Sequence, residues 1–394
     1  MTEPTDIDRG QIGAERPGPR EPGPVLSDLA AQLLFPRIFR AGPAAARPSR
    51  VLVAGIGVLV VGLVAVLFNG DPRGAGPGLL EGPVTMLRTA SDGLGRAVVS
   101  LDLGDLHERV RLLLLETPRQ MFQDAPAGAA VLLLTIAVVW ALCGAFIARG
   151  AALELGRHVH VRATLALRFV LVKGPAAVAT FVFVPVAALV LLAVPAVLGL
   201  LLAAPGLDVL GALLHGVGLI ASLVAAFLLV VWLAAAWLMV PAVACDGSDA
   251  FDATQRALGI VLSRPISVGL HLALAVLQGL VLVSVVWAVA DLGTSMAFWA
   301  AGLFTETGAA IAGAGGELTS GMSATTAFSV RVVALWHMLP MLVTISYAVS
   351  YSHTAGVAVY LNARQMVDGQ EPNEIWMPGG PAGTTASTDA DETV

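Results

Sequence analysis

The chain has 394 residues, of which 57% are hydrophobic and 13% are charged, and its formal net charge is −6. Soluble domains carry about 25% charged residues, so the chain has roughly half the usual charge, and long apolar stretches separate its charges. This composition excludes an ordinary soluble domain, and the acidic balance excludes the basic surface expected of a nucleic-acid-binding protein.

Six stretches without Asp, Glu, Lys or Arg are long enough to predict transmembrane helices. They lie at 51–68, 128–148, 176–203, 213–241, 266–290 and 332–360. A helix needs about 20 apolar residues to cross about 30 Å of hydrocarbon. One charged residue at the centre of such a helix would cost about 2.5 to 3.5 kcal/mol, and none is present. We therefore predict an all-α fold, a polytopic transmembrane helical bundle with six spans within residues 51–365.

The third predicted span carries prolines at a regular interval. Pro175, Pro185 and Pro195, followed by Pro205, recur every ten residues. An interior proline leaves the carbonyl of the fourth residue before it without its helical hydrogen bond. In a membrane that carbonyl needs another partner, so we expect neighbouring helices to supply donors near these positions.

The cationic residues predict the orientation in the membrane. They cluster on one side of the spans, at Arg37, Arg40, Arg47, Arg50, Arg149, Arg157, Arg162, Arg168, Lys173, Arg256, Arg264 and Arg364. The connections near 204–208 and 291–330 contain no Arg or Lys. By the positive-inside rule, both termini are expected in the cytoplasm. Residues 70–127 are assigned outside although they hold arginines, because so long a connection follows the rule only weakly.

The composition also predicts the kind of membrane. Lys173 is the only lysine, and Arg, Ala, Gly, Val and Leu are used heavily. This usage is typical of a GC-rich bacterial genome. We therefore expect the chain in the bacterial cytoplasmic (inner) membrane.

The two ends of the chain are expected to be tails. Residues 1–24 and 366–394 are polar and rich in Pro, Gly, Thr or Asp, which predicts disorder. Residues 25–39 place leucines on one face of a helix. This pattern predicts either an interfacial helix on the cytoplasmic leaflet, within a segment that reaches residue 50, or a helix packed on the bundle.

The two long external connections are expected to differ. Residues 70–127 predict an amphipathic insertion with helices at 79–101 and 103–121, since apolar residues recur there at helical spacing. Residues 291–330 predict an external loop rich in Gly, Ala and Thr. Within that loop, residues 295–313 contain an apolar patch that is compatible with a re-entrant or interfacial segment.

Two segments on the cytoplasmic side resemble a known family. They read GAFIARGAALELGRHVHVRATLALRFVLVKGP and VPAVACDGSDAFDATQRALGIVLSRP. They are similar to the helical membrane domain attached to some bacterial glycerophosphoryl diester phosphodiesterases, and to its stand-alone, uncharacterised multi-pass relatives. That family typically shows a span, an acidic-Gly turn, a short Ala/Leu helix and a basic residue before the next span. The corresponding positions here are Asp246-Gly247, Ala253 to Leu258 and Arg264-Pro265.

The resemblance covers roughly residues 140–290 and implies a membrane fold and location. It implies no reaction, because the metal-binding catalytic barrel of those phosphodiesterases has no counterpart in this sequence. The chain has no polar stretch long enough to form that barrel.

The last predicted span holds the most polar stretch inside the membrane. Ser346, Tyr347, Ser350, Tyr351 and His353 bring hydroxyl groups and an imidazole into its inner half. Ser346 and Ser350 share one face by their i, i+4 spacing. One interpretation is hydrogen bonding between helices, at about 0.6 kcal/mol per bond. The other is a polar pathway or a lipid-contact pocket, for which these five are the candidate site residues.

One pair of histidines suggests a metal site. His158 and His160 lie near Glu154 on the cytoplasmic side. A protein metal site usually has three or four ligands at helical or hairpin spacing, and only two histidines and one acid are at hand here. We therefore interpret these residues as polar side chains at the headgroup level, and we expect no metal and no cofactor.

Three aspartates suggest a carboxylate site. Asp246, Asp249 and Asp252 recur every three residues around Ser248. Ser is a favoured N-cap residue, and acids in the first turn complement the helix dipole. We therefore interpret this group as the start of a helix capped by Ser248.

The predicted function follows from groups that the spans lack. No span holds an acidic or basic residue near its middle, as ion-coupled carriers usually do, and none combines a nucleophile with a base and a carboxylate. We therefore expect no enzyme; only the family resemblance suggests a lipid-modifying one. The leading hypothesis is a scaffold, assembly factor or accessory subunit that contacts the lipid bilayer and other membrane subunits or further copies of itself. The alternative is a permease component or passive channel for a small solute or lipid.

Overall fold

The structure, a computed structural model, describes residues 35–69, 103–112, 116–124, 126–304 and 323–377, with the single positions Gly93, Arg96 and Ser100. By its contacts, the chain divides into two units at Phe35 and Pro36, and the helices named here belong almost entirely to the second, Pro36–Val394. The described residues form ten helices and no strand. Six of these helices are long and apolar enough to cross a membrane. The predicted fold class, an all-α polytopic membrane protein with six candidate spans, is confirmed.

Along the chain, the six long helices alternately begin and end in one region, the charged end, which contains Arg50, Glu154, Asp246 and Arg364. They are α3 (Pro48–Asn69), α7 (Pro126–Arg157), α8 (Ala163–Ala203), α9 (Asp208–Asp246), α11 (Pro265–Gly302) and α13 (Ala324–Asp368). Arg50 at the start of α3 pairs with Glu154 near the end of α7 at 2.7 Å. Arg364 near the end of α13 pairs with Asp246, the last residue of α9, also at 2.7 Å. The start of α8 packs there through Ala166, in one cluster with Phe146 of α7, and the start of α11 through Ser267, which donates to the Sδ of Met366 at 3.4 Å. The starts of three helices and the ends of the other three therefore lie together.

Proline and glycine account for several helix boundaries. Pro48, Pro126 and Pro265 are the first residues of α3, α7 and α11. Proline suits this position because its missing N–H would have no helical partner there. α9 and α13 end at Gly247 and Gly369, whose φ angles of 63° and 67° are left-handed. Glycine adopts this conformation without steric cost, so both helices stop there.

The prolines of the third predicted span lie inside a helix, as expected. Pro175, Pro185 and Pro195 are inside α8, and the helix continues through all three. Proline at position 185 leaves the carbonyl of Phe181 without a helical donor. The indole Nε1 of Trp232, on α9, donates to that carbonyl at 3.2 Å. The expected donor from a neighbouring helix is therefore present for Pro185.

Four shorter helices accompany these six in the described part. They are α2 (Phe35–Ala45), α5 (Leu103–Arg111), α6 (Thr117–Asp124) and α10 (Ala250–Ser263). The helix predicted over 103–121 is divided between α5 and α6, and Met121 of α6 is fully buried against α7. The helix predicted at 79–101 lies outside the described residues except for three single positions.

The α2 helix packs on the bundle. It overlaps the helix predicted at 25–39 only at residues 35–39, and both alternatives for that helix stay predictions because residues 25–34 lie outside the described part. Its Ile38 and Ala41 side chains are fully buried. The side chain of Gln278, on α11, donates to the carbonyl of Phe39 at 3.2 Å. Residues 1–34, which include the predicted tail 1–24, lie outside the described residues.

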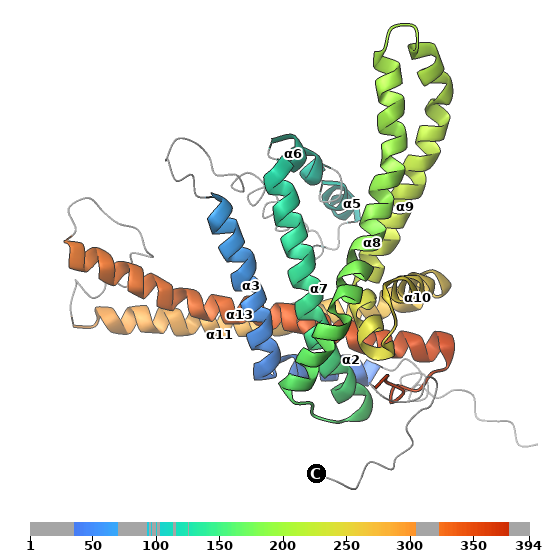
Figure 1. Ribbon diagram of the computed structural model, residues 1–394. Coiled ribbons are helices and arrows are strands. Elements are labelled where there is room, and N and C mark those ends of the chain that lie inside the picture. Colours follow the sequence, from blue (N-terminus) through green and yellow to red (C-terminus); the bar gives the residue numbers. More distant parts are fainter. Residues whose placement is uncertain are drawn as a thin grey trace, which may run out of the picture. The chain divides into compact units, whose positions relative to one another are not determined.

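Two pairs of long helices form antiparallel hairpins. α8 and α9 lie side by side, as do α11 and α13 (Figure 1). Along the described residues, α11 makes no extended contact with α8 or α9. Apolar side chains are therefore uncovered on the helices; Leu213 of α9, for example, is 80% exposed. Such a surface requires lipid or another apolar partner.

Helix extends into the predicted external loop 291–330. α11 runs to Gly302 and α13 begins at Ala324 with its N-cap Ser323. The Oγ of Ser323 accepts a hydrogen bond from the N–H of Thr326 at 3.2 Å. Residues 305–322 lie outside the described residues, so the re-entrant hypothesis for 295–313 stays a prediction beyond residue 304.

Candidate functional site

The five candidate residues of the last span are all buried, and two of them bind the end of α2. The Oγ of Ser350 donates to the carbonyl of Ala45 at 2.7 Å, and the Oη of Tyr347 donates to that of Gly42 at 3.4 Å. The last carbonyls of a helix have no helical donors of their own. These two hydroxyls therefore satisfy the C-terminal end of α2.

The other three candidate residues also contact helices. The Oη of Tyr351 donates to the carbonyl of Ala275, on α11, at 2.7 Å, and the Oγ of Ser346 donates to that of Leu342 at 2.6 Å. The ring centroid of His353 lies 4.4 Å from that of Trp140, on α7. All five side chains thus lie at contacts of α13 with its neighbours.

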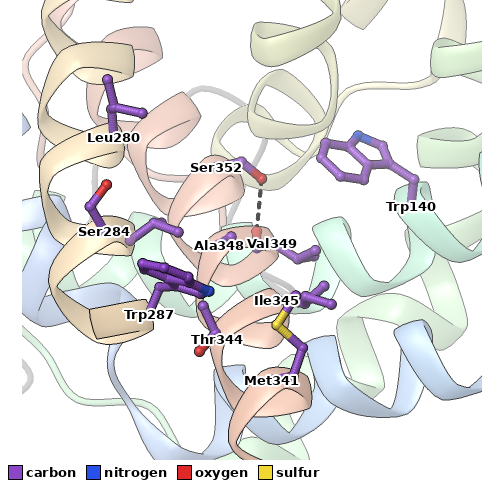
Figure 2. A pocket seen from close by; sticks show the side chains of 11 residues that line it. Trp140, Leu280, Ser284, Trp287, Met341, Thr344, Ile345, Ala348, Val349 and Ser352 are labelled. Atoms are coloured by element: carbon purple, nitrogen blue, oxygen red, sulfur yellow. Dashed lines mark hydrogen bonds between the residues drawn. The ribbon is translucent and has the colours of Figure 1, made fainter. Parts of the chain in front are cut away.

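A cavity of about 480 Å³ lies beside this stripe, among α7, α11 and α13. Figure 2 shows Leu280 and Trp287 of α11 on one side of α13 and Trp140 of α7 on the other. Two hydroxyls in its lining, of Thr344 and Ser352, donate to carbonyls of their own helix at 2.9 and 2.8 Å. None of the five candidate residues lines the cavity, and most of its lining is apolar.

The charged end contains a buried carboxylate with several donors. Asp246 accepts from Arg364 at 2.7 Å, from Arg256 at 2.5 Å and from the hydroxyl of Tyr360. Burial lowers the pKa of the Arg256 guanidinium, but the combined interactions with Asp246, Tyr360 and Asp368 outweigh burial, so the pKa is raised. The carboxylate therefore joins the ends of α9 and α13 to α10.

The cap of α10 differs from the prediction. Asp249, rather than Ser248, is the N-cap residue, and its carboxylate accepts from the N–H of Asp252 at 3.0 Å. Asp is as favourable as Ser at this position. The three aspartates thus have different roles, because Asp246 belongs to the end of α9 and the other two to the start of α10.

A second buried cation, Arg149 of α7, has no carboxylate partner among the described residues. It is fully buried and donates to the carbonyls of Ala244 and Trp376, each at 2.8 Å. Its guanidinium lies 5.0 Å from the ring centroid of Phe169 and 5.7 Å from that of Trp376. Carbonyl oxygens and ring faces therefore take the place of a counter-ion.

The residues after α13 pack on this charged end. In this C-terminal segment (369–377), the N–H of Trp376 donates to the carbonyl of Cys245 at 2.8 Å. Arg157 donates to the carbonyls of Asn373 and Ile375, each at 2.8 Å, and Ile375 is buried. We predicted a disordered tail over 366–394. The structure instead gives residues 366–377 a helix end and an ordered, packed segment, and residues 378–394 lie outside the described part.

His158 and His160, the pair considered as metal ligands, have different surroundings. Glu154 accepts from Arg47 at 2.8 Å and from Arg50 at 2.7 Å, and His160 lies 3.0 Å from Arg47. His158 lies in a left-handed turn at the end of α7, with φ of 59°. Among the described residues, no three His, Cys, Asp or Glu side chains are placed to hold a metal ion.

Sequence reasoning missed the buried arginines because it used them only to assign orientation. A signal was nevertheless present around Arg149. Small residues are concentrated before and after it, at Gly144, Ala145, Ala148, Gly150, Ala151, Ala152 and Gly156. Small residues let membrane helices approach closely, and here they surround a buried cation.

Comparison with known proteins adds no assignment: no family model, no curated protein and no solved structure matches this chain.

Proposed function

We propose that the chain is a non-catalytic scaffold or accessory subunit of a bacterial inner membrane, with both termini in the cytoplasm. One observation supports this most directly. The hydroxyls of Tyr347, Ser350 and Tyr351 are bound to backbone carbonyls of α2 and α11. Side chains engaged in this way join helices and leave few polar groups to line a solute path.

The uncovered apolar helix faces support the same proposal. The helices are held together at the charged end, and exposed Leu, Val and Ile side chains extend along α8, α9 and α11. A monomeric membrane protein places such faces against lipid, whereas a subunit of an assembly places part of them against partner helices. We propose that other membrane subunits, or further copies of this chain, pack on one of these faces.

Site-specific photo-crosslinking in intact cells tests the scaffold. A photoreactive phenylalanine analogue is introduced at exposed positions of α9 and α11, namely Val209, Leu213, Ile220, Leu277 and Val281. We expect discrete protein adducts from positions on one helix face only, and the remaining positions serve as controls that contact lipid. Adducts with lipid alone at every position would contradict the proposal.

A flux measurement separates the scaffold from the permease alternative. Proteoliposomes are expected to release small solutes no faster than empty liposomes. Release that is lost in the Ser350→Ala and His353→Ala variants would instead support a polar pathway through the last span.

Cysteine labelling tests the proposed orientation of the chain in the membrane. Single cysteines are introduced at Asp208→Cys and Ala324→Cys, at the far end of the helices, and at Asn373→Cys in the C-terminal segment; all three positions are exposed. A membrane-impermeant maleimide is expected to label the first two in intact cells and the third only after permeabilisation. The natural thiols give little background, because Cys245 is buried and Cys143 half-buried. Labelling of Asn373→Cys from outside would reverse the proposed topology.

A further inference from the structure

A small cavity at the charged end lies where three long helices begin or end. It has a volume of about 240 Å³ and lies among the start of α3, the last third of α7 and the start of α8. Its polar lining consists of Arg47, Ser49, Arg50, Glu154 and His160. The rest of the lining is Pro48, Phe146, Gly150, Val161, Ala163 and Ala166.

The lining carries more positive than negative charge. Two guanidinium groups share the single carboxylate of Glu154, which accepts from Arg47 at 2.8 Å and from Arg50 at 2.7 Å. Arg50 is 6% exposed and also donates to the carbonyl of Ala44 at 2.5 Å, so its position is fixed. Arg47 is 42% exposed, and its Nη1 makes no hydrogen bond to the described residues. A residue that lines the cavity therefore carries a charged group with a donor unused among the described residues.

Two helix starts add to this positive potential. Pro48 and Ser49 at the start of α3 line the cavity, as does Ala163 at the start of α8. The first turn of a helix has N–H groups without helical acceptors and carries a partial positive charge. The side chain of Arg162, the N-cap residue of α8, makes no capping hydrogen bond. The cavity thus combines two arginines, a histidine and two helix starts around one carboxylate.

We propose that this cavity binds the phosphate group of an anionic phospholipid. Phosphate oxygens accept several hydrogen bonds, which suits a guanidinium with unused donors. The three helices that line it are candidate spans, and the cavity lies at their ends, where lipid headgroups are found. The apolar part of the lining, such as Phe146 and Ala166, faces the same space and suits the glycerol and upper chain region. The proposal depends on the chain spanning a membrane, but not on its being a scaffold.

Native mass spectrometry of the delipidated full-length chain in detergent tests the site. Phosphatidylglycerol, phosphatidylcholine of the same chain length and inorganic phosphate are added in separate titrations. We expect the wild type to retain phosphatidylglycerol at least about fivefold better than phosphatidylcholine, since the surplus charge favours the anionic headgroup. Equal retention of the two lipids would overturn the proposal, and binding of inorganic phosphate without a preference for phosphatidylglycerol would overturn the lipid assignment.

Matched variants test whether a preference for phosphatidylglycerol arises from this cavity. Arg47→Gln is expected to abolish the preference for phosphatidylglycerol, and Arg47→Lys to keep part of it. Arg264→Gln is the control, because Arg264 is an exposed arginine at the charged end that does not line the cavity. It removes the same charge and is expected to leave the preference unchanged. Equal losses in Arg47→Gln and Arg264→Gln would show a general charge effect and contradict the site. Because Arg47 is partly exposed, its variants are expected to fold, which a thermal melt of each checks.

Discussion

Replacing Asp246 by alanine is expected to lower the free energy of unfolding by about 3 to 5 kcal/mol, the usual effect of removing one partner from a buried ion pair. The side chains of Asp246 and Arg364 are only 8% and 2% exposed. In Asp246→Ala, the Arg364 guanidinium and the Tyr360 hydroxyl lose an acceptor that water cannot fully replace. Reversible unfolding in mixed detergent micelles, followed by circular dichroism, measures the difference.

Two variants show whether the buried charge causes this loss. Asp252→Ala removes an exposed acid from the first turn of α10, and its expected cost is about 0.5 kcal/mol. Asp246→Asn combined with Arg364→Met leaves neither partner charged, and should recover much of the stability lost by Asp246→Asn alone. Equal unfolding midpoints for Asp246→Ala and Asp252→Ala would contradict a stabilising role for the carboxylate.

The spans could be predicted because their signal is local. An apolar run of sufficient length favours a membrane helix whatever its neighbours are, and prolines and glycines punctuate these runs. The same local logic predicted a donor for the carbonyl freed by Pro185, although it could not identify Trp232. The helices are longer than the apolar runs that predicted them. The predicted span covers 128–148, whereas α7 has 32 residues and extends beyond about 30 Å of hydrocarbon. The extra turns carry Arg149 and Glu154.

The charged end could not be predicted because its partners are distant in sequence. Arg364 and Asp246 are 118 residues apart, and Arg50 and Glu154 are 104 apart. Which cation meets which acid depends on how the helices pack, and the count of arginines per connection does not contain that information.

The partners of the polar residues in the last span could not be predicted from the sequence either. Polar residues at i, i+4 spacing predicted one shared polar face and left open whether it joins helices or lines a pathway. Their partners include the carbonyls of Gly42 and Ala45 at the end of α2. The sequence offered two alternatives for the region before the first span, so it could not show that these hydroxyls satisfy a helix end.

Replacing Trp376 by alanine is expected to release the C-terminal segment from the charged end. The indole ring lies 5.7 Å from the guanidinium of Arg149 and 5.5 Å from the ammonium of Lys173, and it contacts Gly247. Each cation–π contact contributes about 0.5 to 2 kcal/mol, so the expected loss is about 3 kcal/mol once the buried ring area is included. Unfolding in mixed micelles measures it, with Glu374→Ala as a control within the same segment.

Alkylation of Cys245 distinguishes local release from general destabilisation. Its thiol is buried, and its carbonyl accepts the N–H of Trp376, so the segment covers this end of α9. In a Cys143→Ala background, Trp376→Ala is expected to speed alkylation of Cys245 by about tenfold for each 1.4 kcal/mol by which opening becomes easier. Glu374→Ala should react at the parent rate. If Trp376→Ala also reacts at that rate while its melting temperature falls, the segment stabilises the fold without covering the core. If neither quantity changes, the packing of residues 369–377 contributes nothing to the stability of the charged end.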